Sequence, residues 1–414
     1  MRMSYDEQEW SSLQEEAARQ ATMTPDFDGD NVLQMVQPLA PKLKASPFVW
    51  RPTAEIPPRQ WLYGRHLLRK FVSVDVAAGG VGKSSVKIGE AVAMASGQSI
   101  YGKDIGDGPL RVWLYNLEDP MEETERRIHA TCQQFFISPD DIGDRLYVNS
   151  GRDQRCVIAE ETQNGARIIV PVVDQIIAEI TEHKIDVLII DPFVSSHDVS
   201  ENDNKAMDLV VKKWGHIADV CNCSINLVHH IRKTNGTEAT ADSSRGAKAL
   251  TDGARSVMVY NRMTKEEAQE AAIKPEHASF YFRTVNDKAN LSPPEAAEWY
   301  RMNNVDLENG DEVGVACRWE WPNLFDGLSV HHLKEVQRAI SEGEWRLDVR
   351  SKGAWVGACI GQALGWDWEE AGAKKKITRM VGTWVKNGAL LVVEKGDKNH
   401  EIRNFVEVGQ WVIE

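Results

Sequence analysis

Short apolar runs alternate with stretches of helical periodicity from about Trp61 onward. Five runs are almost continuously apolar, which is typical of strands in a parallel sheet with both faces covered by helices. They span 71–76, 110–117, 185–190, 224–228 and 255–260. Two later runs, 279–285 and 313–321, alternate apolar and polar residues and predict an antiparallel extension at the sheet edge. The pattern predicts an α/β domain with a mostly parallel sheet.

The pattern changes at about Val330. Apolar residues recur at helical spacing in 330–340, and further helices are predicted over 355–364 and 369–386. The last of these ends at Asn387-Gly388, where glycine can adopt the left-handed conformation of a helix cap. Two strands, 390–394 and 402–408, follow and are joined by a turn-rich segment. Three helices and a terminal hairpin predict a small winged-helix domain.

The first residues of the chain have neither pattern. A short amphipathic run at 10–21 gives way to a polar stretch that contains Pro38, Pro41 and Pro47, which predicts a partly flexible arm. We therefore expect three parts: an N-terminal arm over 1–47, an ATPase-type α/β domain over 48–329 and a winged-helix domain over 330–414.

Charge and composition exclude several classes of protein. The 414 residues include 48 Lys plus Arg and 62 Asp plus Glu, so the formal charge is −14 and a protein that coats DNA with a basic surface is excluded. The six cysteines form no CxxC pair, which excludes zinc fingers and zinc ribbons. The acidic start and the lack of an apolar run of about 18 residues predict a cytoplasmic protein without a leader or membrane span.

The strongest chemical signal is the sequence AAGGVGKS at 77–84, between the first apolar strand and a helical run at 85–96. Such a loop turns backbone N–H groups toward phosphate oxygens, while its lysine reaches the β- and γ-phosphates and its hydroxyl ligates Mg²⁺. Ala77 replaces the first consensus glycine, but three glycines remain. We predict that ATP and Mg²⁺ bind here; the predicted phosphate-binding residues are Gly79, Gly80, Val81, Gly82, Lys83, Ser84 and Ser85.

Hydrolysis requires carboxylates at the carboxyl ends of neighbouring strands. Asp191 ends the run 185–190 and is the predicted second metal ligand beside Ser84. Glu118 follows the run 110–117 and is the predicted general base, with Asp119 as the alternative. His229 and His230 close the run 224–228, and of the two we expect His230 to sense the γ-phosphate.

Seven short motifs occur in one order along the chain: AAGGVGKS, YNLEDP, LIIDPF, LVHHIRK, SSRG, TDGAR and NDKAN. Together they resemble the RepA-type branch of RecA-like hexameric helicases of plasmids and prophages, over roughly 61–321. The resemblance implies a RecA-like P-loop fold and a homo-hexamer that hydrolyses ATP at its subunit interfaces and passes single-stranded DNA through a central pore. It also implies a role in plasmid or prophage DNA replication.

The same resemblance assigns an arginine finger to Arg255, at the end of TDGAR. A guanidinium suits this role because it neutralises transition-state charge without a proton equilibrium. Arg245 and Lys288 are alternative cations that could act on the neighbouring subunit's site. The arm and the C-terminal domain depart from the family pattern, so a recombination or loader ATPase, or a DNA-binding regulator that does not translocate, stays open.

Candidate contacts to DNA lie in two places. In the ring architecture the segments 195–205 and 231–248 face the pore, and the second contains four cations that could bind backbone phosphates: Arg232, Lys233, Arg245 and Lys248. In the helix predicted over 369–386, Lys375 and Arg379 lie among apolar residues, as in a recognition helix. The winged-helix domain could instead bind a protein partner, since it is only weakly basic.

Overall fold

The computed structural model describes residues 44–231, 238–241, 248–271, 273–293, 295–322, 324–396 and 401–412. The chain divides into two compact units, Met1–Pro57 and Pro58–Glu414. In the first unit, the described residues have no regular secondary structure apart from one short 3₁₀ helix, Thr53–Glu55, none of whose residues is buried. All other elements belong to the second unit.

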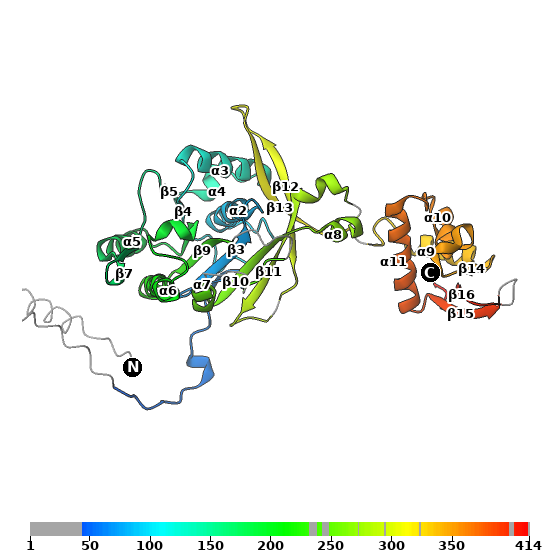
Figure 1. The fold of residues 1–414 in the computed structure, drawn as a ribbon, viewed down its shortest axis with the longest axis horizontal. Coiled ribbons are helices and arrows are strands. Elements are labelled where there is room, and N and C mark those ends of the chain that lie inside the picture. Colours follow the sequence, from blue (N-terminus) through cyan, green and yellow to red (C-terminus); the bar gives the residue numbers. More distant parts are fainter. Residues whose placement is uncertain are drawn as a thin grey trace, which may run out of the picture. The chain divides into compact units, whose positions relative to one another are not determined.

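A nine-stranded sheet forms the centre of the second unit, in the order β13-β12-β11-β10-β3-β9-β8-β4-β5 (Figure 1). Six strands are parallel: β3 (Val72–Ala78), β4 (Val112–Asn116), β5 (Leu146–Ser150), β8 (Val187–Asp191), β9 (Ser224–Ile231) and β10 (Ser256–Arg262). Three are antiparallel: β11 (Tyr281–Ala289), β12 (Glu298–Asp306) and β13 (Glu312–Trp319). The mostly parallel α/β fold and its antiparallel extension are confirmed.

Helices cover both faces of this sheet, as the apolar strands require. The helix α2 (Lys83–Ser96) packs with Val112, Leu114 and Val187 on one face, together with α3 (Met121–Phe135). On the other face, α5 (Val170–His183), α6 (Asn204–Val220) and α7 (Lys248–Gly253) pack against the other side of β3. Smaller elements are β1 (Trp61–Tyr63), β2 (Leu67–Leu68), α4 (Pro139–Ile142), β6 (Ala159–Thr162), β7 (Gly165–Ile168) and α8 (Lys265–Glu270).

The C-terminal part contains the three predicted helices, α9 (Val330–Ser341), α10 (Val356–Leu364) and α11 (Ala371–Lys386). The predicted hairpin is also present as β15 (Leu390–Gly396) and β16 (Ile402–Val408), and the two-residue strand β14 (Trp345–Arg346) extends it to a sheet of order β14-β16-β15. Ile340, Trp355, Ile377, Trp384 and Leu390 share one buried cluster. The predicted helices and hairpin are present in the predicted order, while the winged-helix assignment and the function of the domain stay predictions.

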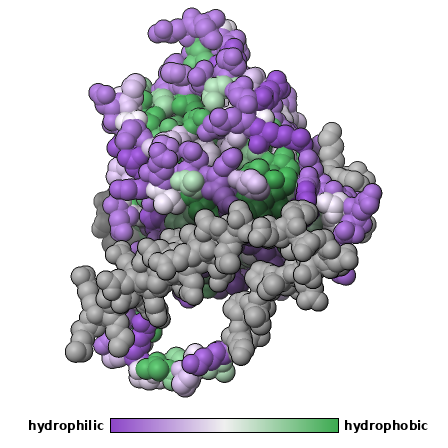
Figure 2. All heavy atoms as spheres, turned by 90° about the vertical axis from the view of Figure 1, so that its left-hand side faces the viewer, coloured by the Kyte–Doolittle hydropathy of each residue, from purple (hydrophilic) through white to green (hydrophobic). Residues whose placement is uncertain are grey.

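The described part of the surface is mostly hydrophilic on the face that Figure 2 draws. Figure 2 shows one face on which hydrophilic residues predominate and hydrophobic residues form separate patches. Among the described residues, no helix has both the length and the apolar character needed to cross a membrane.

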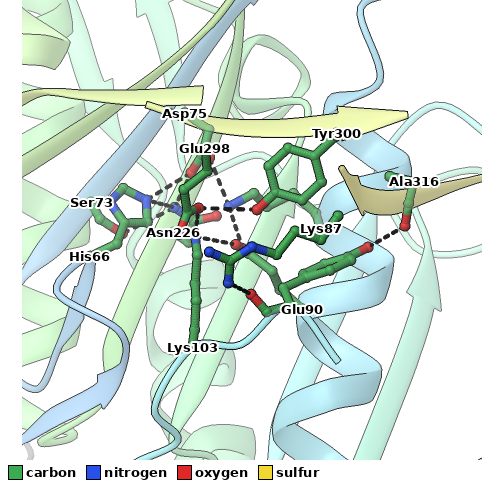
Figure 3. A network of polar contacts seen from close by, with 12 residues as sticks. His66, Ser73, Asp75, Lys87, Glu90, Lys103, Asn226, Glu298, Tyr300 and Ala316 are labelled. Carbon is green, nitrogen blue, oxygen red and sulfur yellow. Dashed lines mark hydrogen bonds and ion pairs between the residues drawn. The ribbon is translucent and has the colours of Figure 1, made fainter. Parts of the chain in front are cut away.

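A network of buried charges lies between the sheet and α2 (Figure 3). Asp75 of β3 is completely buried, and its carboxylate lies 2.7 Å from Lys87 Nζ and 3.0 Å from His66 Nε2. It also accepts hydrogen bonds from the Tyr260 hydroxyl at 2.7 Å and from Asn226 Nδ2 at 2.6 Å. Burial by itself raises the pKa of Asp75, but Lys87 and His66 outweigh it and lower this pKa below its ordinary value.

The network continues from α2 to the antiparallel extension. Lys87 Nζ donates to Glu90 at 2.6 Å, and Lys103 Nζ lies 3.5 Å from Glu90 and 3.0 Å from Glu298 of β12. Breaking a buried ion pair of this kind typically costs about 3–5 kcal/mol, because the remaining charge loses its partner. The network therefore fixes α2 against β3 and β12.

Candidate nucleotide-binding site

The predicted phosphate loop, residues 77–84, joins the end of β3 to the start of α2, so the expected order of strand, loop and helix is confirmed. Gly80 and Gly82 have φ angles of 71° and 118°, which L-residues rarely adopt. A Cβ at Gly82 would also lie 2.9 Å from the ring of Phe282. The loop conformation therefore requires glycine at position 82.

Lys83, the first residue of α2, is 3% exposed, and its ammonium is held by the loop itself. Its Nζ donates to the carbonyl oxygens of Ala77 at 3.0 Å and Ala78 at 3.2 Å. Burial lowers the pKa of Lys83 to about 8, against the opposing charges of Asp191, Asp75 and Glu118. A phosphate chain over the loop would give this buried cation a partner.

Ser84 and Asp191 come together as a metal site would require. Asp191 ends β8 and is 4% exposed, and the Ser84 side chain is hydrogen-bonded to it. Burial raises the pKa of Asp191, while Ser84 and Lys83 act in the opposite direction. A hydroxyl and a carboxylate fit Mg²⁺, which usually takes one or two protein ligands and completes its shell with phosphate and water. Among the described residues, no group of three or more His, Cys, Asp or Glu forms a self-sufficient metal cage.

The Ser85 side chain, unlike that of Ser84, binds the backbone of β13. Its hydroxyl donates to the Gly314 carbonyl at 3.2 Å and accepts from the Ala316 N–H at 2.9 Å. These two bonds join α2 to β13. A contribution of Ser85 to phosphate binding would therefore come from its backbone N–H.

The two acidic residues after β4 are placed differently. Asp119 is engaged by Arg127, whose Nη1 lies 2.9 Å away, and by Asn116 Nδ2 at 3.1 Å. Glu118 is exposed, and its backbone N–H donates to Asn116 Oδ1 at 2.9 Å. The charge of Glu118 acts on both Lys83 and His230, so Glu118 lies in the neighbourhood of the loop. This arrangement favours Glu118 over Asp119 as the base.

The two histidines at the end of β9 also differ. His230 Nδ1 lies 3.3 Å from Lys83 Nζ, and burial lowers the pKa of His230. The neighbouring side chain, His229, is buried, and its Nδ1 lies 3.7 Å from a carboxylate oxygen of Glu201. Burial lowers the pKa of His229 to about 4. Of the pair, His230 has the contact with Lys83 of the phosphate loop, while its role as a sensor of the γ-phosphate stays a prediction.

A pocket of about 490 Å³ opens from the loop. Besides Gly80, Gly82, Lys83, Ser84, Ser85 and His230, its walls include Arg126 and Arg127 of α3, Met302 of β12 and residues 311–314 around the start of β13. The sequence analysis did not predict that these residues line the pocket. It also missed Arg262, at the end of β10, whose Nη2 donates to the Gly80 carbonyl. The position of Arg262 could have been predicted from parallel pairing of β10 with β3, because this pairing brings the end of β10 to the phosphate loop.

Arg255 lies at the amino-terminal ends of the parallel strands, whereas the phosphate loop of its own chain lies at their carboxyl-terminal ends. Its neighbour Ser256 pairs with Ser73 at the start of β3, whereas the loop follows the end of that strand. Arg255 is exposed, and its guanidinium lies 5.7 Å from the centre of the Phe71 ring. The structure therefore does not bring Arg255 together with Lys83 within one chain.

Lys288 shares this edge, because it pairs with Val257 on the neighbouring strand. Its Nζ donates to the carbonyl oxygens of Thr251 at 2.8 Å and Asp252 at 2.9 Å. Burial lowers the pKa of Lys288, and the charges of Arg255 and Lys248 act in the same direction. Of the predicted trans-acting cations, Arg255 and Lys288 are thus close together, while Arg245 lies outside the described residues.

The predicted DNA contacts are only partly described. Arg232, Lys233 and Arg245 lie outside the described residues. Lys248 begins α7 and pairs with Asp252 at 3.4 Å. On α11, Lys375 Nζ donates to Gln269 at 2.6 Å and Arg379 Nη1 donates to the Glu270 carbonyl at 3.3 Å. The role of these cations in DNA binding stays a prediction.

The chain is similar to a known family over part of its length. A family model described as an AAA domain matches residues 37–236. The matched region contains the phosphate loop, Glu118, Asp191 and His230, and it ends before Arg255. The match and the loop geometry agree, and together they support a P-loop ATPase domain of the AAA type in the matched region.

Proposed function

We propose that this protein is an ATP-driven DNA helicase or translocase of the RepA type that works as a ring of identical subunits, a homo-hexamer, in plasmid or prophage replication. The position of Arg255 carries the proposal. It is exposed at the sheet edge opposite its own phosphate loop, so it can complete a nucleotide site only on another copy of the chain. A closed ring gives every site such a neighbour.

In this proposal each ATP is hydrolysed at the pocket of one subunit. Lys83 and the loop N–H groups bind the phosphates. Ser84 and Asp191 would hold Mg²⁺, which would supply positive charge to offset the negative charge that develops on the phosphates. Glu118, which follows β4 at the carboxyl ends of the parallel strands, orients and deprotonates the attacking water. His230 lies beside Lys83. In this proposal it contacts the γ-phosphate and so couples the presence of this phosphate to the position of β9 and of the segment that follows β9.

The proposed DNA path follows from the distribution of charge. From Val330 to the end of the sequence there are 13 Lys plus Arg and 12 Asp plus Glu, a net charge of +1, so the rest of the chain carries −15. An acidic exterior repels DNA. We propose that single-stranded DNA is confined to the pore, where the cations of segment 231–248 bind it and segment 195–205, with three acidic residues and one lysine, does not attract it by charge. Duplex DNA or a protein partner is confined to the C-terminal domain.

Two assays test this proposal. Hydrolysis should be stimulated by single-stranded DNA, and forked duplexes should be unwound when ATP is present. The alternative, a DNA-binding regulator or a recombination or loader ATPase, predicts stimulated hydrolysis without unwinding. Strong DNA-stimulated turnover that never separates strands on forks of either polarity would reject the motor and favour the alternative.

Nucleotide affinity should depend on pH through Lys83. Its pKa of about 8 means that the ammonium loses its proton above that pH, and a neutral amine attracts phosphate poorly. The apparent Kd for ATP should therefore rise above pH 8, by up to about tenfold per pH unit, until the higher pKa of the bound state is reached. Titrations from pH 7 to 10 measure this rise.

The matched control is Lys83→Arg, because a guanidinium stays charged throughout this range. This variant should bind ATP more weakly but with a Kd that does not vary between pH 7 and 10. A wild-type Kd that is equally insensitive to pH would contradict the role given to the Lys83 ammonium.

A further inference from the structure

A second pocket, of about 450 Å³, lies on the antiparallel extension, and the proposed hydrolysis does not use it. β12 pairs with β11 only as far as Arg301, which lies opposite Tyr281. On that side the next residues of β12 have no strand partner within the described part of the chain. The 3₁₀ helix before β11, Pro275–Phe280, and Gln134 of α3 line the space beside them. The uneven ends of two paired strands thus form the pocket.

The pocket contains a cation without an anionic partner. On the strands of the extension, Arg283 of β11 forms two ion pairs and Arg318 of β13 donates to a backbone carbonyl. The Arg301 guanidinium lies 5.8 Å from the centre of the Tyr281 ring and has no ion pair or hydrogen bond among the described residues. No acidic residue of the described chain lines this pocket, whereas acidic residues line the phosphate-loop pocket. A guanidinium with unused N–H groups suits a phosphate.

The other lining residues suit a flat ring whose edge forms hydrogen bonds. Phe280 is 43% exposed, and the centre of the His277 ring lies 6.2 Å from the centre of its own ring. Exposed aromatic rings of this kind stack with unpaired bases. Asn303 and Asn304 use their Nδ2 atoms within the extension, which leaves their Oδ1 atoms to accept hydrogen bonds from a base edge. The pocket thus combines groups for a phosphate, for the face of a base and for its edge.

We propose that this pocket binds one nucleotide of a single-stranded nucleic acid, with its phosphate at Arg301 and its base at Phe280. The charge favours a strand over a free nucleotide. A phosphodiester carries one negative charge, which one guanidinium balances, whereas a terminal phosphate carries about −1.5 to −2 at pH 7. The inference rests on the proposed binding of single strands and extends the path of the strand by one contact beyond the pore segments.

The test measures binding of a fluorescent oligothymidylate to the full chain by anisotropy, over a range of salt concentrations. Phe280→Ala should lower the affinity by about tenfold, the loss expected for one stacked base, and leave its salt dependence unchanged. Arg301→Ala should lower the affinity and also reduce the slope of log K against log salt by about 0.7, the value for one phosphate contact on a single strand. The two variants therefore separate the base contact from the phosphate contact.

Arg65→Ala is the matched control. Arg65 is also an exposed arginine over an aromatic ring, with its guanidinium 5.6 Å from the centre of the Trp61 ring, but it does not line the pocket. This variant should bind the oligothymidylate like wild type. Unchanged binding in both pocket variants, or an equal loss in Arg65→Ala and Arg301→Ala, would overturn the site.

Free nucleotides test the other possible ligands. Thymidine monophosphate should bind wild type more weakly than the oligothymidylate does; equal affinity, lowered by both pocket variants, would assign the pocket to a free nucleotide and overturn the strand. ATP should bind wild type and both variants equally, since the pocket shares only Met302 with the phosphate-loop pocket. A loss of ATP affinity would instead assign the pocket to the ATP site. Wild type that bound no oligothymidylate would reject the proposed binding of single strands itself.

Discussion

Replacing Glu118 by Gln should reduce ATP turnover by roughly 10²–10⁴-fold, the usual contribution of a general base, while ATP still binds with nearly unchanged affinity. The amide keeps the size of the side chain but cannot accept the proton of water. Phosphate binding depends on Lys83 and the loop, which the substitution leaves in place. Steady-state turnover and a separate binding titration measure the two effects.

Asp119→Asn is the neighbouring control. Asp119 binds Arg127 and Asn116, so its replacement should disturb the end of β4 and lower stability more than it lowers turnover per folded molecule. Wild-type turnover by Glu118→Gln would remove Glu118 as the base. A larger catalytic loss in Asp119→Asn than in Glu118→Gln would transfer the role to Asp119.

Arg255→Ala should lose turnover by roughly 10³–10⁵-fold, the range for an arginine finger supplied to a phosphoryl-transfer site, and should retain ATP binding. Because Arg255 lies at the edge away from its own loop, mixing this variant with Lys83→Ala subunits should partly restore hydrolysis. In such mixtures some sites combine an intact Lys83 from one subunit with an intact Arg255 from the other. Turnover measured across mixing ratios follows the restoration.

Arg262→Ala is the control for this experiment. Arg262 is on the same strand as Arg255, but it contacts Gly80 of its own chain. A mixture of Arg262→Ala and Lys83→Ala subunits contains no site with both residues intact, so it should not recover. Failure of the Arg255→Ala mixture to recover would contradict a role in trans.

The sequence predicted those parts of the site that directly follow an apolar strand. The loop, Glu118, Asp191 and His230 each follow an apolar strand directly, and parallel strands bring such positions to one edge. Arg126 was not predicted, because its partner Asp311 is distant in sequence and belongs to the extension. The pairing of the two residues depends on how the extension folds over α3.

Two strands of the central sheet, β12 and β5, escaped prediction for a related reason. β12 contains Trp299, Tyr300, Met302 and Val305 among charged and amide residues, without a clean period of two. β5 is an edge strand with mostly half-buried residues, so its apolar signal is weak. Lys87 and Glu90 resemble solvent-facing residues of a helix in the sequence, and only the position of Asp75 on β3 explains their burial.

The buried charges of α2 also affect how the protein uses the free energy of nucleotide binding. If α2 turned or slid by one residue, Lys87 would leave Asp75 and Glu90 would leave Lys103, so the buried ion pairs that join the helix to its surroundings would break. The helix that begins with Lys83 and Ser84 therefore has one permitted register even when no nucleotide is bound. Little of the binding free energy has to be consumed in ordering this helix, and the remainder is available for work between subunits.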